Sequence, residues 1–343
     1  MPEEALYVSL EPPPSVKYRL CLNENLFLPR ELVAEVVREA AESVDPRLYH
    51  DAYGEELAER LAEFHRVDVE EIVIGPGADY LIYLLASYSR VGGAVIVEPT
   101  FEEYRRAVQL YGGRITTVLL DDDFRLKPER LKGAAASIAY LASPNNPTGN
   151  QFERGAVEDA IESFRGIVVV DEAYAEYARY SMLSEAIERD NLVVIRTFSK
   201  AWGLAGLRVG YLVTNRRLAS ELKARGRVFA CSSLSLKAAS LMLERWEAVR
   251  RAIEELKTVR EWLRRELTKI GVKAYPSDAN FLLVRLPVDS GEVCTKLLEK
   301  GIAVKNVSSL PLCDNCIRVT IPPKPIAEIF INALSSVLEQ SAL

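Results

Sequence analysis

A lysine and an aspartate each follow an apolar run, at positions where a side chain can do covalent or acid–base chemistry. Lys200 comes shortly after residues 192–196, and Asp171 directly follows residues 167–170. A lysine just past a buried strand lies close to protein, which suits an amine that must lose its proton to react. A partly buried aspartate needs a partner, and a pyridinium N–H would supply a charge-assisted hydrogen bond. The alternative role for Asp171 is a helix N-cap.

Residues suited to an anion surround the lysine. Thr197 and Ser199 precede it, and Arg208 follows it by eight residues. Ala78 and Asp79 begin a predicted helix after a glycine, where backbone N–H groups can bind a phosphate; an ordinary strand-to-helix turn is the alternative. The cofactor chemistry that needs a lysine beside a phosphate is that of pyridoxal phosphate.

Four further residues could contact a flat cofactor or its substrate. Phe101 could stack on a ring or be a core aromatic. Asn146, in a polar segment after a strand, and Tyr174, three residues past Asp171, could both bond a phenolic oxygen. Arg318 could fork onto a substrate carboxylate or lie on a strand surface.

The elements that position these residues alternate along residues 72–213. Apolar strands without polar alternation are followed by helical patterns, which predicts a mostly parallel sheet covered on both faces. Ligands bind at the carboxyl ends of such strands, and the candidate residues of this region follow strand ends.

Three regions follow from the pattern. We predict an arm and first helix at 1–45 that pack with a small domain, including an extended proline segment at 11–14. A large cofactor-binding domain is predicted at 46–235. A linking helix and a smaller α/β domain are predicted at 236–343, with one continuous helix over 234–270.

Composition narrows the class of protein. The chain has 343 residues, 49% hydrophobic and 27% charged, and a net charge of −6, which argues against a nucleic-acid or anionic-membrane surface. No signal peptide or membrane-spanning run is seen, so we expect a cytoplasmic protein. Five cysteines and two histidines do not suggest a zinc site, and we expect no metal; the pair Cys313 and Cys316 is best explained by a turn, with a local disulfide as the alternative.

Taken together, these segments resemble fold-type-I pyridoxal-phosphate enzymes of the aspartate aminotransferase superfamily, and most of all the histidinol-phosphate aminotransferases. The resemblance covers nearly the whole chain. It rests on Asn23-Glu24-Asn25, Tyr49, Gly77-Ala78-Asp79, Pro99-Thr100-Phe101, Ser143 to Gly149, Asp171 to Tyr174, Thr197 to Lys200 with Arg208, and Cys316 to Thr320.

The resemblance implies a role for each matching residue. Lys200 would hold the cofactor as an internal aldimine and move the substrate proton, with Asp171 on the pyridine nitrogen and Tyr174 at the ring oxygen. The remaining cofactor contacts would be Ala78, Asp79, Phe101, Asn146, Thr197, Ser199, Arg208 and, from the partner subunit of a homodimer, Tyr49. Arg318 and Asn25 would bind the substrate.

The implied activity is ping-pong transamination of histidinol phosphate with 2-oxoglutarate, in histidine biosynthesis. The alternatives are a threonine-phosphate decarboxylase or an aromatic or broad-range aminotransferase on the same scaffold. A pyridoxal-phosphate-binding regulator would need a DNA-binding module, for which the sequence has no room before residue 20. Departures at His50, at Leu26–Pro29 and at Pro322–Pro323 lie near the substrate and weaken the choice of amino acid; Lys17, Tyr18 and Arg19 are candidates for its distal end.

Overall fold

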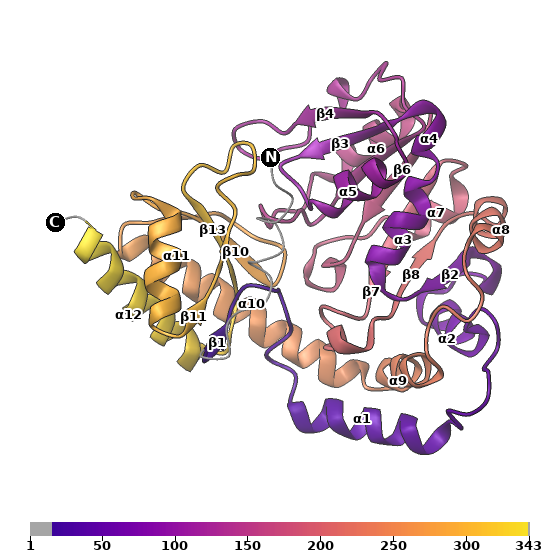
Figure 1. Cartoon of the computed structure of the whole chain (residues 1–343), viewed down its shortest axis with the longest axis horizontal. Helices are drawn as coiled ribbons and strands as arrows, with labels where there is room; N and C mark the ends of the chain where they lie inside the picture. Colours follow the sequence, from indigo (N-terminus) through magenta and orange to yellow (C-terminus); the bar gives the residue numbers. More distant parts are fainter. Residues whose placement is uncertain (1–15, 342–343) are drawn as a thin grey trace.

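A seven-stranded sheet forms the centre of the larger of two lobes (Figure 1). The computed structural model describes residues 16–341, so the proline segment at 11–14 lies outside the described residues. The strands are β2 (Ile72–Gly75), β3 (Ala94–Glu98), β4 (Ile115–Leu119), β5 (Ile138–Ala142), β6 (Ile167–Asp171), β7 (Leu192–Thr197) and β8 (Gly210–Val213). Their order is β2-β8-β7-β6-β5-β3-β4, and β8 runs antiparallel to both neighbours while the others pair in parallel. The predicted mostly parallel seven-stranded sheet is confirmed.

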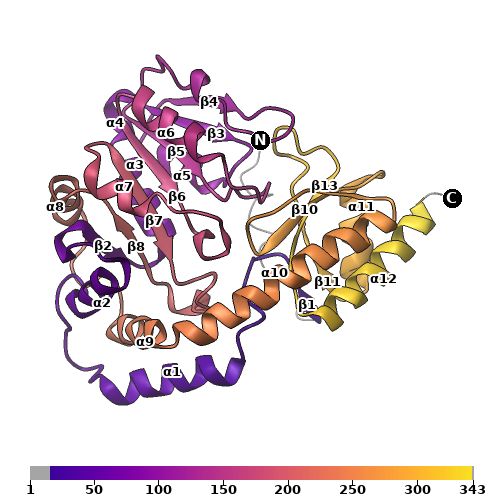
Figure 2. The ribbon, with the colours of Figure 1, turned by 180° about the vertical axis from the view of Figure 1, so that it is seen from behind.

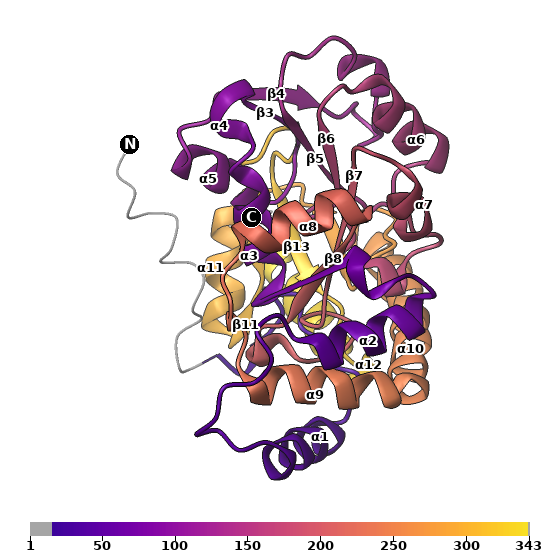
Figure 3. The same cartoon turned by 90° about the vertical axis from the view of Figure 1, so that its right-hand side faces the viewer.

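Helices cover both faces of this sheet, as its uniformly apolar strands require. Side chains alternate between the faces: Val169 packs in the cluster that contains Leu85, and Val168 and Val170 pack in the cluster that contains Ile161. Figure 3 shows α3 and α5 on one side of the sheet and α6 and α7 on the other. The covering helices are α2 (Glu55–His65), α3 (Gly77–Ala86), α4 (Ser89–Gly92), α5 (Glu103–Leu110), α6 (Arg154–Ser163), α7 (Leu183–Glu188) and α8 (Arg216–Arg225). Short 3-10 turns occur at Val69–Glu71, Pro128–Arg130, Ala175–Tyr177 and Ala205–Leu207.

The smaller lobe is a four-stranded sheet with two helices packed against each other (Figure 2). Its strand order is β12-β13-β10-β9, and the neighbouring strands pair antiparallel. A separate two-stranded sheet joins β1 (Tyr18–Arg19), from the N-terminal arm, to β11. The remaining elements are β9 (Lys273–Ala274), β10 (Phe281–Arg285), α11 (Ser290–Glu299), β11 (Ile302–Ala303), β12 (Lys305–Asn306), β13 (Cys316–Thr320) and α12 (Lys324–Ser341).

The connection between the lobes differs from the single helix predicted over 234–270. The structure has α9 (Ser233–Glu244) and α10 (Trp246–Lys269), which are separated at Arg245. Neither glycine nor proline marks this break, and the apolar spacing of the two helices runs on across it, so the pattern alone did not reveal it. The first helix, α1 (Arg30–Ser43), has its main contacts with α9, whereas the arm before it joins the small domain through the pairing of β1 with β11.

Four strand ends bring the candidate residues to one edge of the large sheet. Asp171 is the last residue of β6 and Thr197 the last of β7, and these strands are neighbours in parallel register. The segments after β3 and β5 begin at the same edge, because parallel strands end on the same side. None of the described helices is long and apolar enough to cross a membrane.

Candidate active site

A pocket of about 520 Å³ opens at this edge, between the large sheet and the small domain. Its walls come from three parts of the chain: the strand ends of the large sheet, the arm at Cys21–Asn23, and the small-domain segment 305–310 with Arg318. The predicted site residues that line it are Ala78, Asp79, Phe101, Asn146, Asp171, Tyr174, Thr197, Ser199, Lys200, Arg208 and Arg318. Eleven of the thirteen residues proposed from the sequence therefore meet in one cavity.

The carboxyl group of Asp171 is buried at the base of the pocket, with 5% of the residue exposed. Burial raises its pKa to about 6, although hydrogen bonds from the Tyr104 hydroxyl and the Ala173 N–H act to lower it. The Tyr104 hydroxyl donates to Oδ2 at 2.7 Å, and the Ala173 N–H donates to Oδ1 at 3.0 Å. No cationic side chain within the described residues forms a salt bridge with Asp171, so its charge is available to a bound N–H group.

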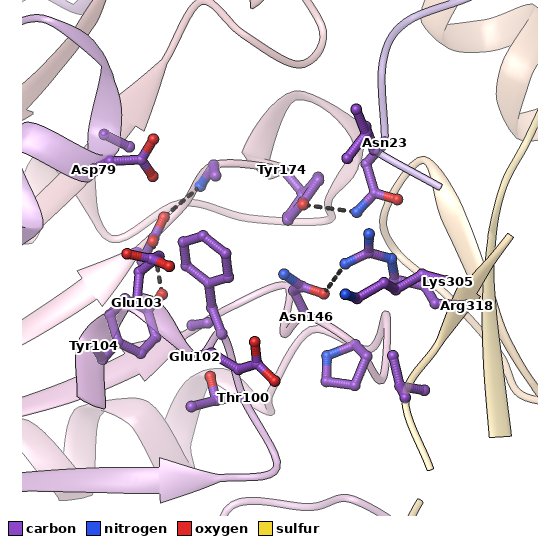
Figure 4. A pocket seen from close by; sticks show the side chains of 18 of the residues that line it. Asn23, Asp79, Thr100, Glu102, Glu103, Tyr104, Asn146, Tyr174, Lys305 and Arg318 are labelled. Atoms are coloured by element: carbon purple, nitrogen blue, oxygen red, sulfur yellow. Dashed lines mark hydrogen bonds between the residues drawn. The ribbon is translucent and has the colours of Figure 1, made fainter. Parts of the chain in front are cut away.

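Lys200 lies in the turn after β7, across the pocket from the small domain. Its Nζ donates to the carbonyl oxygen of Leu22 at 3.0 Å and lies 5.7 Å from the centre of the Tyr174 ring. The Tyr174 hydroxyl in turn accepts a hydrogen bond from Asn23 Nδ2 at 2.9 Å (Figure 4). The arm therefore closes one side of the pocket by direct contacts with both side chains.

A cluster of donors at the start of α3 could hold a phosphate. Arg208 donates through Nη2 to Asp79 Oδ2 at 2.6 Å and through Nη1 to Ser199 Oγ at 3.2 Å. Gly77 has a φ of +85°, which favours glycine, and a Cβ there would lie 2.7 Å from Arg208 Nη2, so another residue would also displace this guanidinium. The helix N-terminus, the guanidinium and the hydroxyls of Thr197 and Ser199 together favour an anion.

At the opposite end of the pocket a buried arginine has only neutral hydrogen-bond partners among the described residues. Arg318 donates to Asn146 Oδ1 at 2.6 Å and to the Cys21 carbonyl at 2.5 Å, and its Nε has no partner in the same part of the chain. Its guanidinium lies 5.4 Å from the centre of the Phe281 ring. A buried cation without a carboxylate is costly, so this position suits an anionic group of a substrate.

A second cation stands beside this arginine. Lys305 on β12 is the register partner of Arg318 on β13, so both side chains lie on one face of the small sheet. Figure 4 shows the two side by side at the pocket, near Asn146. Burial lowers the pKa of Lys305, and the carboxylate of Glu102 acts in the opposite direction.

Behind the pocket, a buried ion-pair network ties the ends of β6 and β7 together. Arg196 lies 3.0 Å from Glu172 Oε2 and 3.1 Å from Glu176 Oε1. Trp202 Nε1 also donates to Glu176 Oε1, at 3.2 Å. Because Glu172 follows Asp171 and Arg196 precedes Thr197, the network fixes the backbone from which the site residues project.

Two predicted residues do not line the pocket. The Asn25 side chain donates to the Ala201 carbonyl at 2.7 Å and accepts from the Phe27 N–H at 2.9 Å. Tyr49 is 86% exposed and its ring lies 4.8 Å from that of Phe229. The candidate Arg19 pairs with Glu24 at 2.6 Å, away from the pocket lining.

Among the other residues that line the pocket, Asn23 was quoted only for the resemblance and was given no role, and Tyr104 and Lys305 were not singled out. Tyr104 follows Phe101 by one helical turn, and Lys305 pairs with Arg318 across two strands. An aromatic in an amphipathic helix is usually a core residue, and a strand pairing is not visible in one sequence. A turn, closed by the Cys316 N–H donating to the Cys313 carbonyl, leads from Cys313 to Cys316 at the start of β13, and both are free thiols, as the turn interpretation predicted.

The residues at the pocket match the chemical groups of pyridoxal phosphate. The donors around Arg208 could bind a phosphate, the buried carboxylate of Asp171 could accept a pyridine N–H, and the amine of Lys200 could react with an aldehyde. The volume suits a cofactor together with a small substrate. One cavity therefore brings together a candidate partner for each of these three groups of the cofactor.

Known proteins agree with this chemistry. The sequence model of the family "Aminotransferase class I and II" matches residues 15–334. Histidinol-phosphate aminotransferases from Pyrococcus furiosus and Methanocaldococcus jannaschii are 36% and 34% identical; the first alignment covers 94% of both chains, the second 93% of this chain and 89% of the relative. The crystal structure of histidinol-phosphate aminotransferase from Sinorhizobium meliloti, in complex with pyridoxal 5′-phosphate, superposes with a TM-score of 0.87 at 27% identity, over 95% of this chain and 91% of that one.

The L-threonine-O-3-phosphate decarboxylase of Porphyromonas gingivalis has the same fold, with a TM-score of 0.85 at 23% identity over 94% of this chain and 99% of that one. The family match covers both lobes and every wall of the pocket. The chain belongs to the class I and II aminotransferase family and is a pyridoxal-phosphate-dependent enzyme of fold type I.

Proposed function

We propose that this enzyme transfers the amino group of histidinol phosphate to 2-oxoglutarate. The observation that carries the proposal is the pair of neighbouring cations, Arg318 and Lys305, at the end of the pocket opposite the predicted cofactor-phosphate cluster. A phosphate monoester carries up to two negative charges and several acceptor oxygens, which two adjacent cations can bind. The curated relatives at 32–36% identity are named for the same activity.

At the cofactor end, the phosphate would be held by the Arg208 guanidinium, the hydroxyls of Thr197 and Ser199, and the backbone N–H groups of Ala78 and Asp79. Support comes from the Arg208–Ser199 contact at 3.2 Å and from the position of Asp79 in the first turn of α3.

The ring would lie between these donors and the small domain. Phe101 would stack on it, and Asn146 and Tyr174 would bond its phenolic oxygen; each lines the pocket from a different segment. When bound, pyridoxal phosphate supplies an electron sink that stabilises negative charge at the substrate Cα. The ionised Asp171 would keep the ring nitrogen protonated by accepting its N–H.

Lys200 is the proposed covalent anchor and general base. Its Nζ would take the proton from the substrate Cα, a role that needs an amine held within reach of that atom. Support comes from the contact of this amine with the carbonyl of Leu22 at 3.0 Å, since both residues line the pocket. Asn25, which contacts Ala201 just after the lysine, would act on the substrate only through the shape of this turn.

A homodimer is part of the proposal, since Tyr49 would reach the cofactor phosphate of the partner subunit. Support comes from a patch of exposed apolar side chains that includes Leu48, Tyr49, Val228 and Phe229. Figure 1 shows the loops after α1 and before α9 near one another at the outer edge of the large lobe. We place the enzyme in the cytoplasm, which the five free cysteines favour.

A panel of amino donors tests the substrate assignment. The purified enzyme is given 2-oxoglutarate with histidinol phosphate, tyrosine, phenylalanine or threonine phosphate, and both glutamate and carbon dioxide are measured. We expect kcat/KM for histidinol phosphate to exceed that for tyrosine by at least about tenfold, and Lys305→Met to lower it by about the same factor, the loss of one charged contact. Lys300→Met, on the outer face of the small domain, is the matched control.

Two outcomes would contradict the assignment. Equal use of the aromatic donors would favour a broad-range aminotransferase. Release of carbon dioxide from threonine phosphate would favour the decarboxylase activity named for the Porphyromonas gingivalis structure with this fold.

A further inference from the structure

Tyr104 makes the only side-chain hydrogen bond to Asp171 seen among the described residues. Its hydroxyl donates to Oδ2 at 2.7 Å from α5, while the Ala173 N–H bonds Oδ1 from the other side. A carboxylate oxygen has two lone pairs, so each oxygen of Asp171 keeps one for a further donor. Figure 4 shows Tyr104 below the pocket, with its hydroxyl directed at the base of the site.

The Tyr104 ring is itself held in place by aromatic packing. It stacks on Tyr140 of β5 with centroids 4.9 Å apart and planes 12° apart, and it meets Phe101 edge to face at 5.8 Å. Tyr140 is anchored through its hydroxyl, which donates to the Ile82 carbonyl at 3.1 Å. Both tyrosines are 1% exposed. The Tyr104 hydroxyl therefore has one fixed direction, towards the carboxylate.

The hydrogen bond from Tyr104 opposes the effect of burial on the ionisation of Asp171. Burial favours the protonated form of Asp171, whereas accepting a pyridinium N–H requires the ionised form. A donor to the carboxylate favours the ionised form and fixes its orientation. We infer that Tyr104 is a positioning residue, whose hydroxyl holds Asp171 ionised and aimed at the ring nitrogen of the cofactor. The inference does not depend on which amino donor the enzyme uses.

The test compares two conservative variants of full-length enzyme, Tyr104→Phe and Tyr140→Phe. Each removes one buried hydroxyl from the same stacked pair, but only the first faces Asp171. The dissociation constant of pyridoxal phosphate is measured from about pH 5.5 to pH 8.5, together with kcat and KM. A lost hydrogen bond to a charged group is equivalent to about one pKa unit or more.

Cofactor binding should weaken at low pH, where Asp171 takes up a proton; we call this part of the pH profile the acid limb. For Tyr104→Phe we expect the midpoint of the acid limb to rise by about one pH unit, so that binding weakens by about threefold near pH 6.5 and little near pH 8.5. We expect kcat to fall by about tenfold with a small change in KM. Tyr140→Phe should leave the acid limb in place. In an Asp171→Asn background, Tyr104→Phe should cause no further pH shift, because the titrating group is gone.

A second variant should move the acid limb of cofactor binding to lower pH. Fluorotyrosine at position 104 keeps the ring and the hydroxyl but is a stronger donor, so the acid limb should move down. If Tyr104→Phe and Tyr140→Phe weaken cofactor binding equally at all pH values, or if fluorotyrosine causes no shift, Tyr104 has only a packing role and the inference is wrong.

Discussion

At the scale of single residues, the site depends on charges that burial makes costly. Asp171 and Arg318 are both buried, and neither has an ion-pair partner of opposite charge among the described residues. Folding alone does not explain such groups, because an unpaired buried charge destabilises a protein. A bound ligand with a group of opposite charge would pair with each of these side chains and would account for its burial. We therefore predict that the buried charges of Asp171 and Arg318 lower the free energy of unfolding of the ligand-free chain, and that bound cofactor and substrate raise it again.

The pH dependence of stability tests this for Asp171. Its pKa is about 6 in the folded protein against 3.8 ordinarily. Well below about pH 4 both folded and unfolded chains hold the proton. Between about pH 4 and pH 6 the unfolded chain has lost it and the folded chain still holds it, so stability falls as the pH rises; above about pH 6 both are ionised and the loss stays constant. Two pH units correspond to about 3 kcal/mol. In cofactor-free enzyme, the free energy of unfolding of Asp171→Asn, relative to that of wild type, should therefore rise by about 3 kcal/mol between about pH 4 and pH 8, as measured by urea unfolding. A difference that stays constant with pH would contradict this.

Residue types and order identified most of the chemistry here. Lys200 and Asp171 were predicted because they follow apolar runs, and Arg208 because it follows the lysine by eight residues; the structure gathers all three in one pocket. Tyr104 was not predicted, since a buried tyrosine on an amphipathic helix is expected to serve the core. Its partner, Asp171, is 67 residues away in the sequence. Such pairs depend on how α5 packs on the sheet, which no local pattern encodes.

At the scale of elements, the ends of β6 and β7 act as one rigid unit. Their parallel pairing sets the distance between Asp171 and the Lys200 turn, and the Arg196 network cross-links them from behind. Burial raises the pKa of Glu176, which the charge of Arg196 counteracts. Removing the arginine would leave two buried carboxyl groups without their cation.

Arg196→Met should therefore lower the free energy of unfolding by about 3–5 kcal/mol. The matched control is Arg189→Met, which removes a partly exposed pair with Glu162 at 3.3 Å and should cost no more than about 1 kcal/mol. Urea unfolding of both variants at neutral pH measures the difference. Equal losses would mean that the buried network contributes no more than a surface ion pair.

Strands and helices of the large domain were predictable because their apolar runs are continuous and bounded by polar turns. The separation of α9 from α10 was not, because the apolar positions keep helical spacing through Arg245. In the small domain, residues 302–306 contain two short strands, β11 and β12, that belong to different sheets. Sheet membership depends on partners distant in sequence, and a single sequence does not show them.

At the scale of the whole molecule, the pocket is closed only when both lobes and the arm are in place. Arg318 and Lys305 come from the small domain, while Asn23 reaches Tyr174 from the arm. The exposed position of Tyr49 places the last predicted cofactor contact outside this pocket, on the surface proposed for dimer formation.

Shared sites in a homodimer can be tested by mixing two defective variants. Tyr49→Ala and Lys200→Ala subunits should each have low activity alone. Random exchange makes half of the dimers mixed, and each mixed dimer has one site with both residues intact, so activity should recover to about a quarter of wild type. Light scattering establishes the oligomeric state of the mixture. Recovery to no more than the average of the two separate variants would show that Tyr49 does not act across subunits.

The most direct test of the account is to find where the cofactor is attached. Enzyme loaded with pyridoxal phosphate is reduced with borohydride, digested, and mapped by mass spectrometry, with Lys200→Arg as the control. We predict a single pyridoxyl group on Lys200 and none in the variant. A label on another lysine, or no covalent label in protein that binds the cofactor, would contradict the assignment of Lys200 on which the proposed chemistry depends.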